Sequence, residues 1–249
     1  MTIMGIGMYG CGACLRPMLG TDMAEHLTLS ISGFDGKSVP NQFLKQDGRA
    51  TGLAILLPGL GYTCDMPLFY YSELQFLVGG YDVLRVDYDY RHLRSTSSGL
   101  ENIAERLFAD VGAATRLATQ QRRYPAIAIV GKSLGTLAMA HLVGTGELSG
   151  DTTSVWMTPL LKEDVVFDAL MNVAGPTGIV IGTEDHHYDD ERLASLEARD
   201  NVTLMTVACG NHSLNAGKSA GESAQTLAST FGQLDTFYDF ADRHDGEMD

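Results

Sequence analysis

Short apolar runs alternate with stretches of helical periodicity along most of this chain, and this alternation strongly restricts its fold. Residues 53–57 are continuously apolar and end at Pro58-Gly59, and residues 126–130 and 178–182 form similar short runs. Continuous runs of this length are typical of strands that are buried on both faces of a parallel sheet. The sequence therefore predicts an α/β fold, a mostly parallel sheet with helices on both faces.

Strand and helix patterns follow one another with short links from residue 25 onward. No internal repeat or low-complexity linker interrupts them, so residues 25–240 are predicted to form one domain. Strands are expected at residues 26–31, 41–46, 53–57, 81–87, 126–130, 153–157, 178–182 and 202–208. Helices are expected at residues 68–78, 100–121, 133–144, 162–172 and 189–199 and within 218–240.

The two ends of the chain differ from this pattern. Residues 1–24 are predicted to be a poorly structured extension, and translation from Met18 or Met23 is an alternative interpretation of this region. Its Cys11-Gly-Ala-Cys14 has the spacing of a redox or metal pair, but no second pair completes a zinc site. Residues 241–249 are expected to be a solvated acidic tail.

Charge and composition exclude several classes of function. The net charge of −14 argues against a nucleic-acid partner, because phosphate binding needs clustered Lys and Arg. No run of eighteen apolar residues is present, so no membrane span is expected. The four cysteines lack the spacing of a disulfide framework, and the N-terminus lacks the features of a signal peptide. These observations favour a cytoplasmic protein.

A serine stands at a predicted strand-to-helix turn. The segment Gly131-Lys132-Ser133-Leu134-Gly135 matches the G-x-S-x-G nucleophile elbow. In such a turn the serine backbone is strained, and side chains two residues before and after would collide, so glycine is needed at both places. Ser133 is therefore the candidate nucleophile. The alternative is an ordinary turn with a capping serine.

A serine hydroxyl needs a base, and His212 is the best candidate. It lies in the loop after the predicted strand at 202–208, at the carboxyl edge where functional loops gather. Asp185 follows the strand at 178–182 and is the candidate acid that would orient the imidazole. Glu184 and Asp164 remain alternatives for the acid.

Acyl transfer also needs hydrogen-bond donors for an oxyanion. The expected donors are the backbone N–H groups of Leu134 and of Leu60, with Gly61 as the alternative to Leu60. Gly59, Gly61 and Tyr62 in the same loop are predicted to contact substrate. The cluster Glu184-Asp185-His186-His187 resembles a set of metal ligands, but adjacent side chains point to different sides, so neither a metal nor a cofactor is expected.

Four motifs together resemble the α/β-hydrolase superfamily, particularly its small dienelactone-hydrolase-like members. They are Leu-Pro-Gly-Leu-Gly-Tyr, Gly-Lys-Ser-Leu-Gly, Gly-Thr-Glu-Asp and Gly-Asn-His-Ser. The resemblance covers residues 25–240 and implies Ser133 as nucleophile, Asp185 as acid and His212 as base. Pro58 stands where many members have His. Dienelactone hydrolases use cysteine as nucleophile, so Ser133 argues against that particular activity.

Many such hydrolases carry a cap domain after the strand at 153–157. Only about twenty residues separate that strand from the next one, which is enough for one helix. The resemblance therefore implies an α/β-hydrolase fold with no cap domain and an open cleft bordered by Trp156. The expected function is hydrolysis of a carboxylic ester on a small-molecule or acylated substrate, through an acyl-enzyme. The alternatives are a thioesterase or acyltransferase with the same triad, and a non-catalytic interaction protein.

Overall fold

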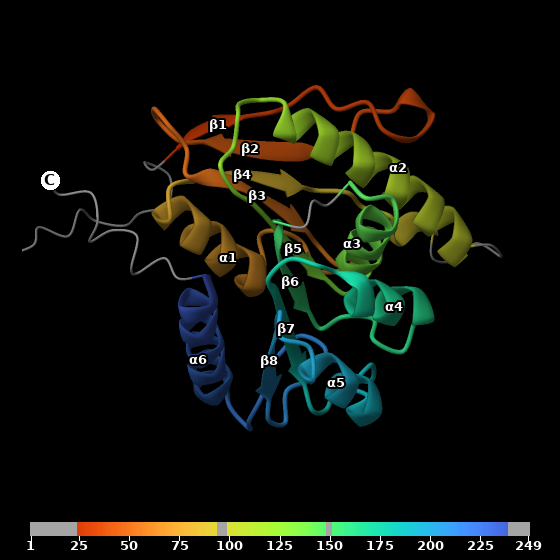
Figure 1. Cartoon of the computed structure of the whole chain (residues 1–249), viewed down its shortest axis with the longest axis vertical. Helices are drawn as coiled ribbons and strands as arrows, with labels where there is room; N and C mark the ends of the chain where they lie inside the picture. Colours follow the sequence, from red (N-terminus) through yellow and green to blue (C-terminus); the bar gives the residue numbers. More distant parts are fainter. Residues whose placement is uncertain (1–23, 94–98, 148–150, 239–249) are drawn as a thin grey trace, which may run out of the picture.

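A computed structural model describes residues 24–93, 99–147 and 151–238, which form a sheet covered by helices on both faces (Figure 1). The strand order in the sheet is β1-β2-β4-β3-β5-β6-β7-β8. Strand β2 pairs antiparallel with β1 and β4, and the strands from β4 to β8 in this order are parallel. The predicted mostly parallel sheet is confirmed.

The described strands and helices have the following bounds. The strands are β1 Glu25–Leu27, β2 Asn41–Lys45, β3 Gly52–Leu57, β4 Tyr81–Val86, β5 Ile127–Lys132, β6 Thr153–Met157, β7 Thr177–Gly182 and β8 Val202–Val207. The helices are α1 Pro67–Val78, α2 Gly99–Thr119, α3 Leu134–Gly144, α4 Asp164–Asn172, α5 Asp190–Glu197 and α6 Ala220–Tyr238. Two short 3₁₀ helices span Phe34–Gly36 and Arg91–Leu93.

The central strand β3 shows how the two layers of core form. Leu53, Ile55 and Leu57 pack in one cluster with residues of α2, α3, α4 and α5. Ala54 and Leu56 point to the other face and pack with residues of α1 and α6. Figure 1 shows α1 and α6 on one side of the sheet and the other four helices on the opposite side. The continuous apolar runs therefore mark strands that are buried on both faces.

Strand β1 ends at Leu27, so the predicted strand at 26–31 is too long. After Leu27, hydrogen bonds from the side chain of Asn41 take the place of pairing with a neighbouring strand. Its Oδ1 accepts a hydrogen bond from Leu29 N at 2.9 Å, and its Nδ2 donates to the carbonyl oxygens of Leu29 and Val39 at 2.8 and 2.9 Å. Because a buried amide side chain satisfies these backbone groups, the chain can leave the sheet at this point.

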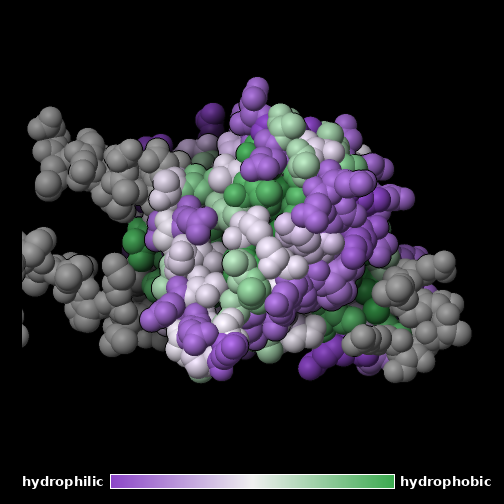
Figure 2. All heavy atoms as spheres, turned by 90° about the horizontal axis from the view of Figure 1, so that it is seen from below, coloured by the Kyte–Doolittle hydropathy of each residue, from purple (hydrophilic) through white to green (hydrophobic). Residues whose placement is uncertain are grey.

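The connection from Met157 to Thr177 contains α4, and no cap domain is inserted there, as predicted. None of the described helices is long and apolar enough to cross a membrane. Figure 2 views the end of the molecule that holds β8, α5 and α6, where hydrophilic residues gather mainly on one side and residues of intermediate hydropathy cover much of the rest, with smaller hydrophobic areas between them. The predictions for residues 1–23, including Cys11 and Cys14, and for residues 241–249 fall outside the described residues.

Candidate functional site

Ser133 lies between the end of β5 and the first residue of α3. Its backbone angles are φ 50° and ψ −112°, a conformation that non-glycine residues rarely adopt. Its N–H donates to the carbonyl oxygen of Met157 in the neighbouring strand β6 at 3.2 Å. This strained turn holds the serine at the carboxyl edge of the sheet, where a sequence of the form G-x-S-x-G is expected to present it.

The two glycines of this motif allow α3 to approach the sheet closely. A Cβ atom on Gly135 would lie 1.9 Å from the carbonyl oxygen of Leu57 in β3. A Cβ atom on Gly131 would lie 2.3 Å from Met139 Sδ and 2.9 Å from the carbonyl oxygen of Gly135. Side chains at either position would therefore push the helix away from the strand that carries the serine.

His212 lies next to Ser133, and Asp185 lies next to His212, although the three residues come from distant parts of the sequence. The distance from His212 Nε2 to Ser133 Oγ is 2.9 Å. On the other side of the ring, His212 Nδ1 lies 2.8 Å from Asp185 Oδ2 and 2.9 Å from Oδ1. A carboxylate at Nδ1 favours the tautomer with its proton on that nitrogen, which leaves Nε2 free to accept the Ser133 hydroxyl proton.

The Asp185 side chain is fully buried, which would by itself raise the pKa of the carboxyl group. The hydrogen bonds from His212 and from the backbone N–H of His187 outweigh burial, so the pKa is lowered from its ordinary value. The group is thus held as an anion beside the imidazole. The alternative acid Asp164 is instead exposed and pairs with Arg192 at 2.5 Å, so the structure does not bring it to the site.

Two loops that follow β7 and β8 are in direct backbone contact. A Cβ atom on Gly182 would lie 2.0 Å from the carbonyl oxygen of Gly210. That same oxygen accepts a hydrogen bond from the backbone N–H of Glu184 at 2.9 Å. The close approach fixes the loop that carries Asp185 against the loop that carries His212, and it uses the backbone of Glu184 rather than its exposed side chain.

A cavity of about 460 Å³ opens in front of Ser133. Leu60, Leu134 and Tyr62 line it, together with His212. Within the described part of the chain, neither the Leu60 nor the Leu134 backbone N–H donates a hydrogen bond to another protein group. Gly59 lies beside the turn, where an added Cβ would be 3.4 Å from Ser133 Cβ. The arrangement leaves two backbone donors available to a bound oxygen.

Trp156 does not line this cavity, contrary to the sequence interpretation. The indole is fully buried in the core under α3 and α4, and its Nε1 donates to Ser154 Oγ at 3.0 Å. The reason is the alternation of side chains along β6, which turns this residue toward the helices. Gly59, Gly61 and Tyr62 do line the cavity.

Lys132 is a component of the site that the sequence interpretation missed. The residue is only 2 % exposed, and its Nζ donates to the backbone carbonyl of His212 at 2.9 Å. The same Nζ lies 4.7 Å from the centre of the Tyr62 ring. One ammonium group therefore contacts both the loop of His212, the candidate base, and the loop of the expected oxyanion donors. The motif gives no signal for it, because the residue before the serine is variable in G-x-S-x-G.

Burial lowers the pKa of Lys132 to about 8, although Asp185 acts in the opposite direction. The folded state then binds fewer protons than the unfolded state between pH 8 and about 10.5. Unfolding takes up a proton in this range, so this group makes the folded state more stable as pH rises. We expect the free energy of unfolding of the wild type, relative to Lys132→Met, to rise by roughly 3 kcal/mol from pH 8 to 10.5.

Urea unfolding of both proteins at several pH values measures this difference. Subtracting the Lys132→Met curve removes the contribution of every other titrating group that the substitution leaves unchanged. Parallel curves across the alkaline range would show that the ammonium is not held in a desolvated position.

Asp185, His186 and His212 are the described residues whose ligand atoms lie close enough to hold a metal ion, within 4.8 Å of one another. The His186 ring is exposed and lies 4.6 Å from the His212 ring, centre to centre. His187 is half-buried, and burial lowers its pKa to about 4, so this imidazole is neutral near pH 7. Asp185 and His212, two of the three candidate ligands, already form a hydrogen bond with each other.

Comparisons with known proteins give matches in sequence families and in solved structures. A family profile described as an alpha/beta hydrolase domain matches residues 52–238. A comparison with curated proteins gives no match. An esterase of Pyrococcus furiosus superposes with a TM-score of 0.64 at 15% identity, over 87% of this chain and 91% of its own.

Two further solved structures have the same fold. Est1E of Butyrivibrio proteoclasticus, with ferulic acid bound, has a TM-score of 0.62 at 15% identity, over 82% of this chain and 98% of its own. A Xanthomonas campestris protein described as an α/β serine hydrolase without a lid has a TM-score of 0.60 at 16% identity, over 89% of this chain and 96% of its own. The family match covers most of the chain and the fold agrees with it, so this protein belongs to the α/β-hydrolase family of enzymes.

Proposed function

We propose that this protein is a serine hydrolase that cleaves a carboxylic ester through an acyl-enzyme, with Ser133, His212 and Asp185 as its catalytic triad. The observation that carries the proposal is the 2.9 Å contact between Ser133 Oγ and His212 Nε2. A buried carboxylate lies on the opposite nitrogen of the same ring. This is the geometry in which an imidazole can remove the proton of an alcohol and remain oriented while it is charged.

The reaction follows from these positions. His212 Nε2 takes the proton of Ser133 as Oγ attacks the ester carbonyl carbon, and the carbonyl oxygen becomes an oxyanion. The N–H groups of Leu60 and Leu134 are the proposed donors to that oxyanion. The tetrahedral intermediate then breaks its bond to the alcohol oxygen, which leaves with the proton from His212. Water then attacks the acyl carbonyl carbon while His212 Nε2 takes its proton. The bond from that carbon to Ser133 Oγ breaks, Oγ regains the proton from His212, and the acid is released.

Labelling by a fluorophosphonate probe tests this proposal, because the probe reacts with activated serines. We expect the wild type to be labelled on Ser133 and Ser133→Ala to remain unlabelled. Ser195→Ala is the matched control, since Ser195 lies on α5 and its hydroxyl donates a hydrogen bond to the carbonyl oxygen of Glu191. This variant should be labelled like the wild type.

Equal labelling of wild type and Ser133→Ala would refute the assignment of the nucleophile. Peptide mass spectrometry of the labelled wild type identifies the modified serine directly. Hydrolysis of p-nitrophenyl acetate by the same three proteins should follow the labelling, with activity lost only in Ser133→Ala.

A further inference from the structure

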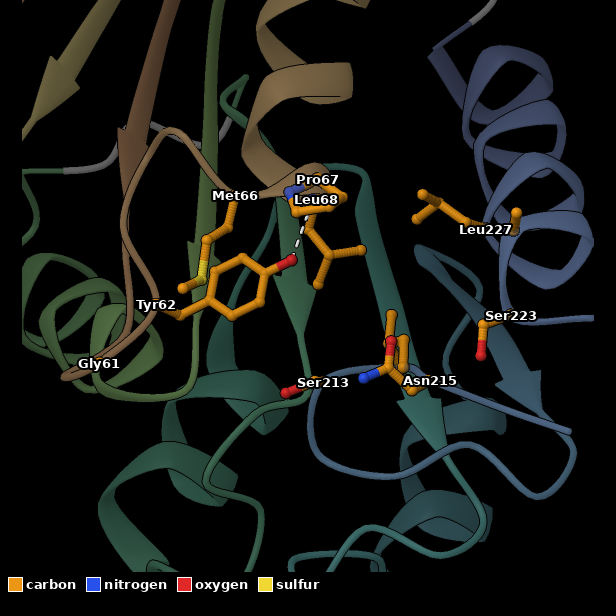
Figure 3. A pocket seen from close by; sticks show the side chains of 11 residues that line it. Gly61, Tyr62, Met66, Pro67, Leu68, Ser213, Asn215, Ser223 and Leu227 are labelled. Carbon is orange, nitrogen blue, oxygen red and sulfur yellow. Dashed lines mark hydrogen bonds between the residues drawn. The ribbon is translucent and has the colours of Figure 1, made fainter. Parts of the chain in front are cut away.

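A second cavity of about 550 Å³, here called the side cavity, lies directly beside the catalytic one. Gly61, Tyr62 and Ser213 line both cavities, so the two spaces meet at these residues. Figure 3 shows the Tyr62 ring and Met66 on one side of the side cavity and Leu227 of α6 on the other. A molecule bound at Ser133 can therefore extend past Tyr62 and Ser213 into this space.

The side cavity has a mainly apolar lining without a charged side chain. Its walls come from the loop before α1, the start of α1, the loop after His212 and α6. The lining residues are Gly61, Tyr62, Met66, Pro67, Leu68, Ser213, Leu214, Asn215, Ser223, Ala224 and Leu227. This lining suits a neutral, hydrophobic group, and the volume is within the range of small-molecule sites.

Tyr62 contributes the face of its ring rather than its hydroxyl group. The Tyr62 hydroxyl accepts a hydrogen bond from the backbone N–H of Leu68 at 3.0 Å, as the dashed line in Figure 3 shows. This bond anchors the ring to the start of α1 while Lys132 lies 4.7 Å from its centre. The ring is thus fixed between the two cavities and presents apolar carbon atoms to the side cavity.

We propose that the side cavity binds the acyl chain of the substrate, so that the enzyme prefers esters of apolar acids over acetate. This inference rests on the proposed function. The oxyanion loop supplies Gly61 and Tyr62 to the side cavity, and the substrate carbonyl must point to the donors of that loop. The leaving alcohol must instead reach His212 Nε2. The His212 ring lies 4.6 and 5.6 Å from the rings of His186 and His187, centre to centre, and these two residues line the catalytic cavity but not the side cavity.

Two ester series separate the acyl side from the alcohol side. For p-nitrophenyl esters from acetate to decanoate, we expect kcat/KM to rise about three- to fourfold for each of the first added methylene groups, as they leave water, and then to level off. For alkyl acetates with lengthening alcohols, we expect no comparable rise. A rise confined to the alcohol series would overturn the assignment of the side cavity to the acyl chain.

Substitutions on α6 test whether the side cavity itself is responsible. Leu227→Trp fills the cavity and should lower the ratio of kcat/KM for p-nitrophenyl octanoate to kcat/KM for p-nitrophenyl acetate by about tenfold or more. Ala224→Phe narrows the same space and should act in the same direction. Gln225→Trp is the control, because Gln225 is exposed, does not line the cavity and lies about 200° around the helix from Leu227.

Activity on acetate also shows that each variant is folded. An unchanged ratio of octanoate to acetate activity in Leu227→Trp and Ala224→Phe would overturn this inference and leave the proposed function intact. Failure of the wild type to hydrolyse any ester or to react with the fluorophosphonate would overturn the proposed function itself.

Discussion

Replacing His212 by alanine is expected to lower kcat/KM for p-nitrophenyl acetate by about 10⁴-fold or more, because Ser133 then loses its proton acceptor. Among the described residues, His212 is the base that hydrogen-bonds to Ser133 Oγ, at 2.9 Å, and the buried Asp185 lies on its other ring nitrogen. Initial rates over a range of substrate concentrations measure the change. Added imidazole should restore part of the activity, since a free base can enter the vacated space in this open cleft.

The matched control is His26→Ala, because His26 is exposed in β1, far along the sheet from the site. Its activity should stay within about twofold of the wild type. If His212→Ala retained wild-type activity, or if imidazole had no effect while the variant was folded, His212 would not be the base.

Replacing Gly135 by alanine is expected to destabilise the protein by about 3 kcal/mol or more, an unusually large effect for one added methyl group. The new Cβ would lie 1.9 Å from the carbonyl oxygen of Leu57, a backbone atom of the central strand β3. Relief requires α3 to move away from the sheet, which also moves Ser133 at the start of that helix. Chemical unfolding measures the loss, and labelling of Ser133 should fall with it.

Gly144→Ala provides a control in the same helix with the opposite sign. Nothing lies within 4 Å of the Cβ position at Gly144, the last residue of α3. Alanine there should stabilise the protein by about 0.5–1 kcal/mol, because glycine loses more conformational freedom on folding. A Gly135→Ala variant as stable as Gly144→Ala would show that α3 does not pack against β3 as closely as described.

The sequence predicted the parallel sheet, and it predicted that three distant side chains lie at the same carboxyl edge because each one follows a strand. Residues that follow parallel strands lie at one edge, and Ser133 after β5, Asp185 after β7 and the loop after β8 meet there because β5, β6, β7 and β8 are neighbours in the sheet. The glycines around Ser133 added a steric reason that can be recognised from the sequence alone. The roles of these residues remain predictions until the variants are measured.

Other features depended on packing that no local pattern encodes. The end of β1 is set by the side chain of Asn41, which accepts a hydrogen bond from the backbone N–H of Leu29, twelve residues earlier in the sequence. Trp156 has the hydrophobic character of a pocket residue, but the direction of its side chain depends on the register of β6 in the sheet. Lys132 occupies a variable position of the motif, and its hydrogen bond to the His212 carbonyl oxygen depends on how the loop after β8 packs against β5.

The position of β8 at the edge of the sheet has a consequence for how activity is lost. Only β7 pairs with β8 among the described strands, whereas β5, which carries Ser133, is enclosed between β3 and β6. Edge elements open at lower free energy than central ones. Mild heat or denaturant should therefore open the loop after β8 first and separate the imidazole of His212 from Ser133 while the central strands stay folded. Activity should then be lost at a lower temperature or denaturant concentration than global unfolding.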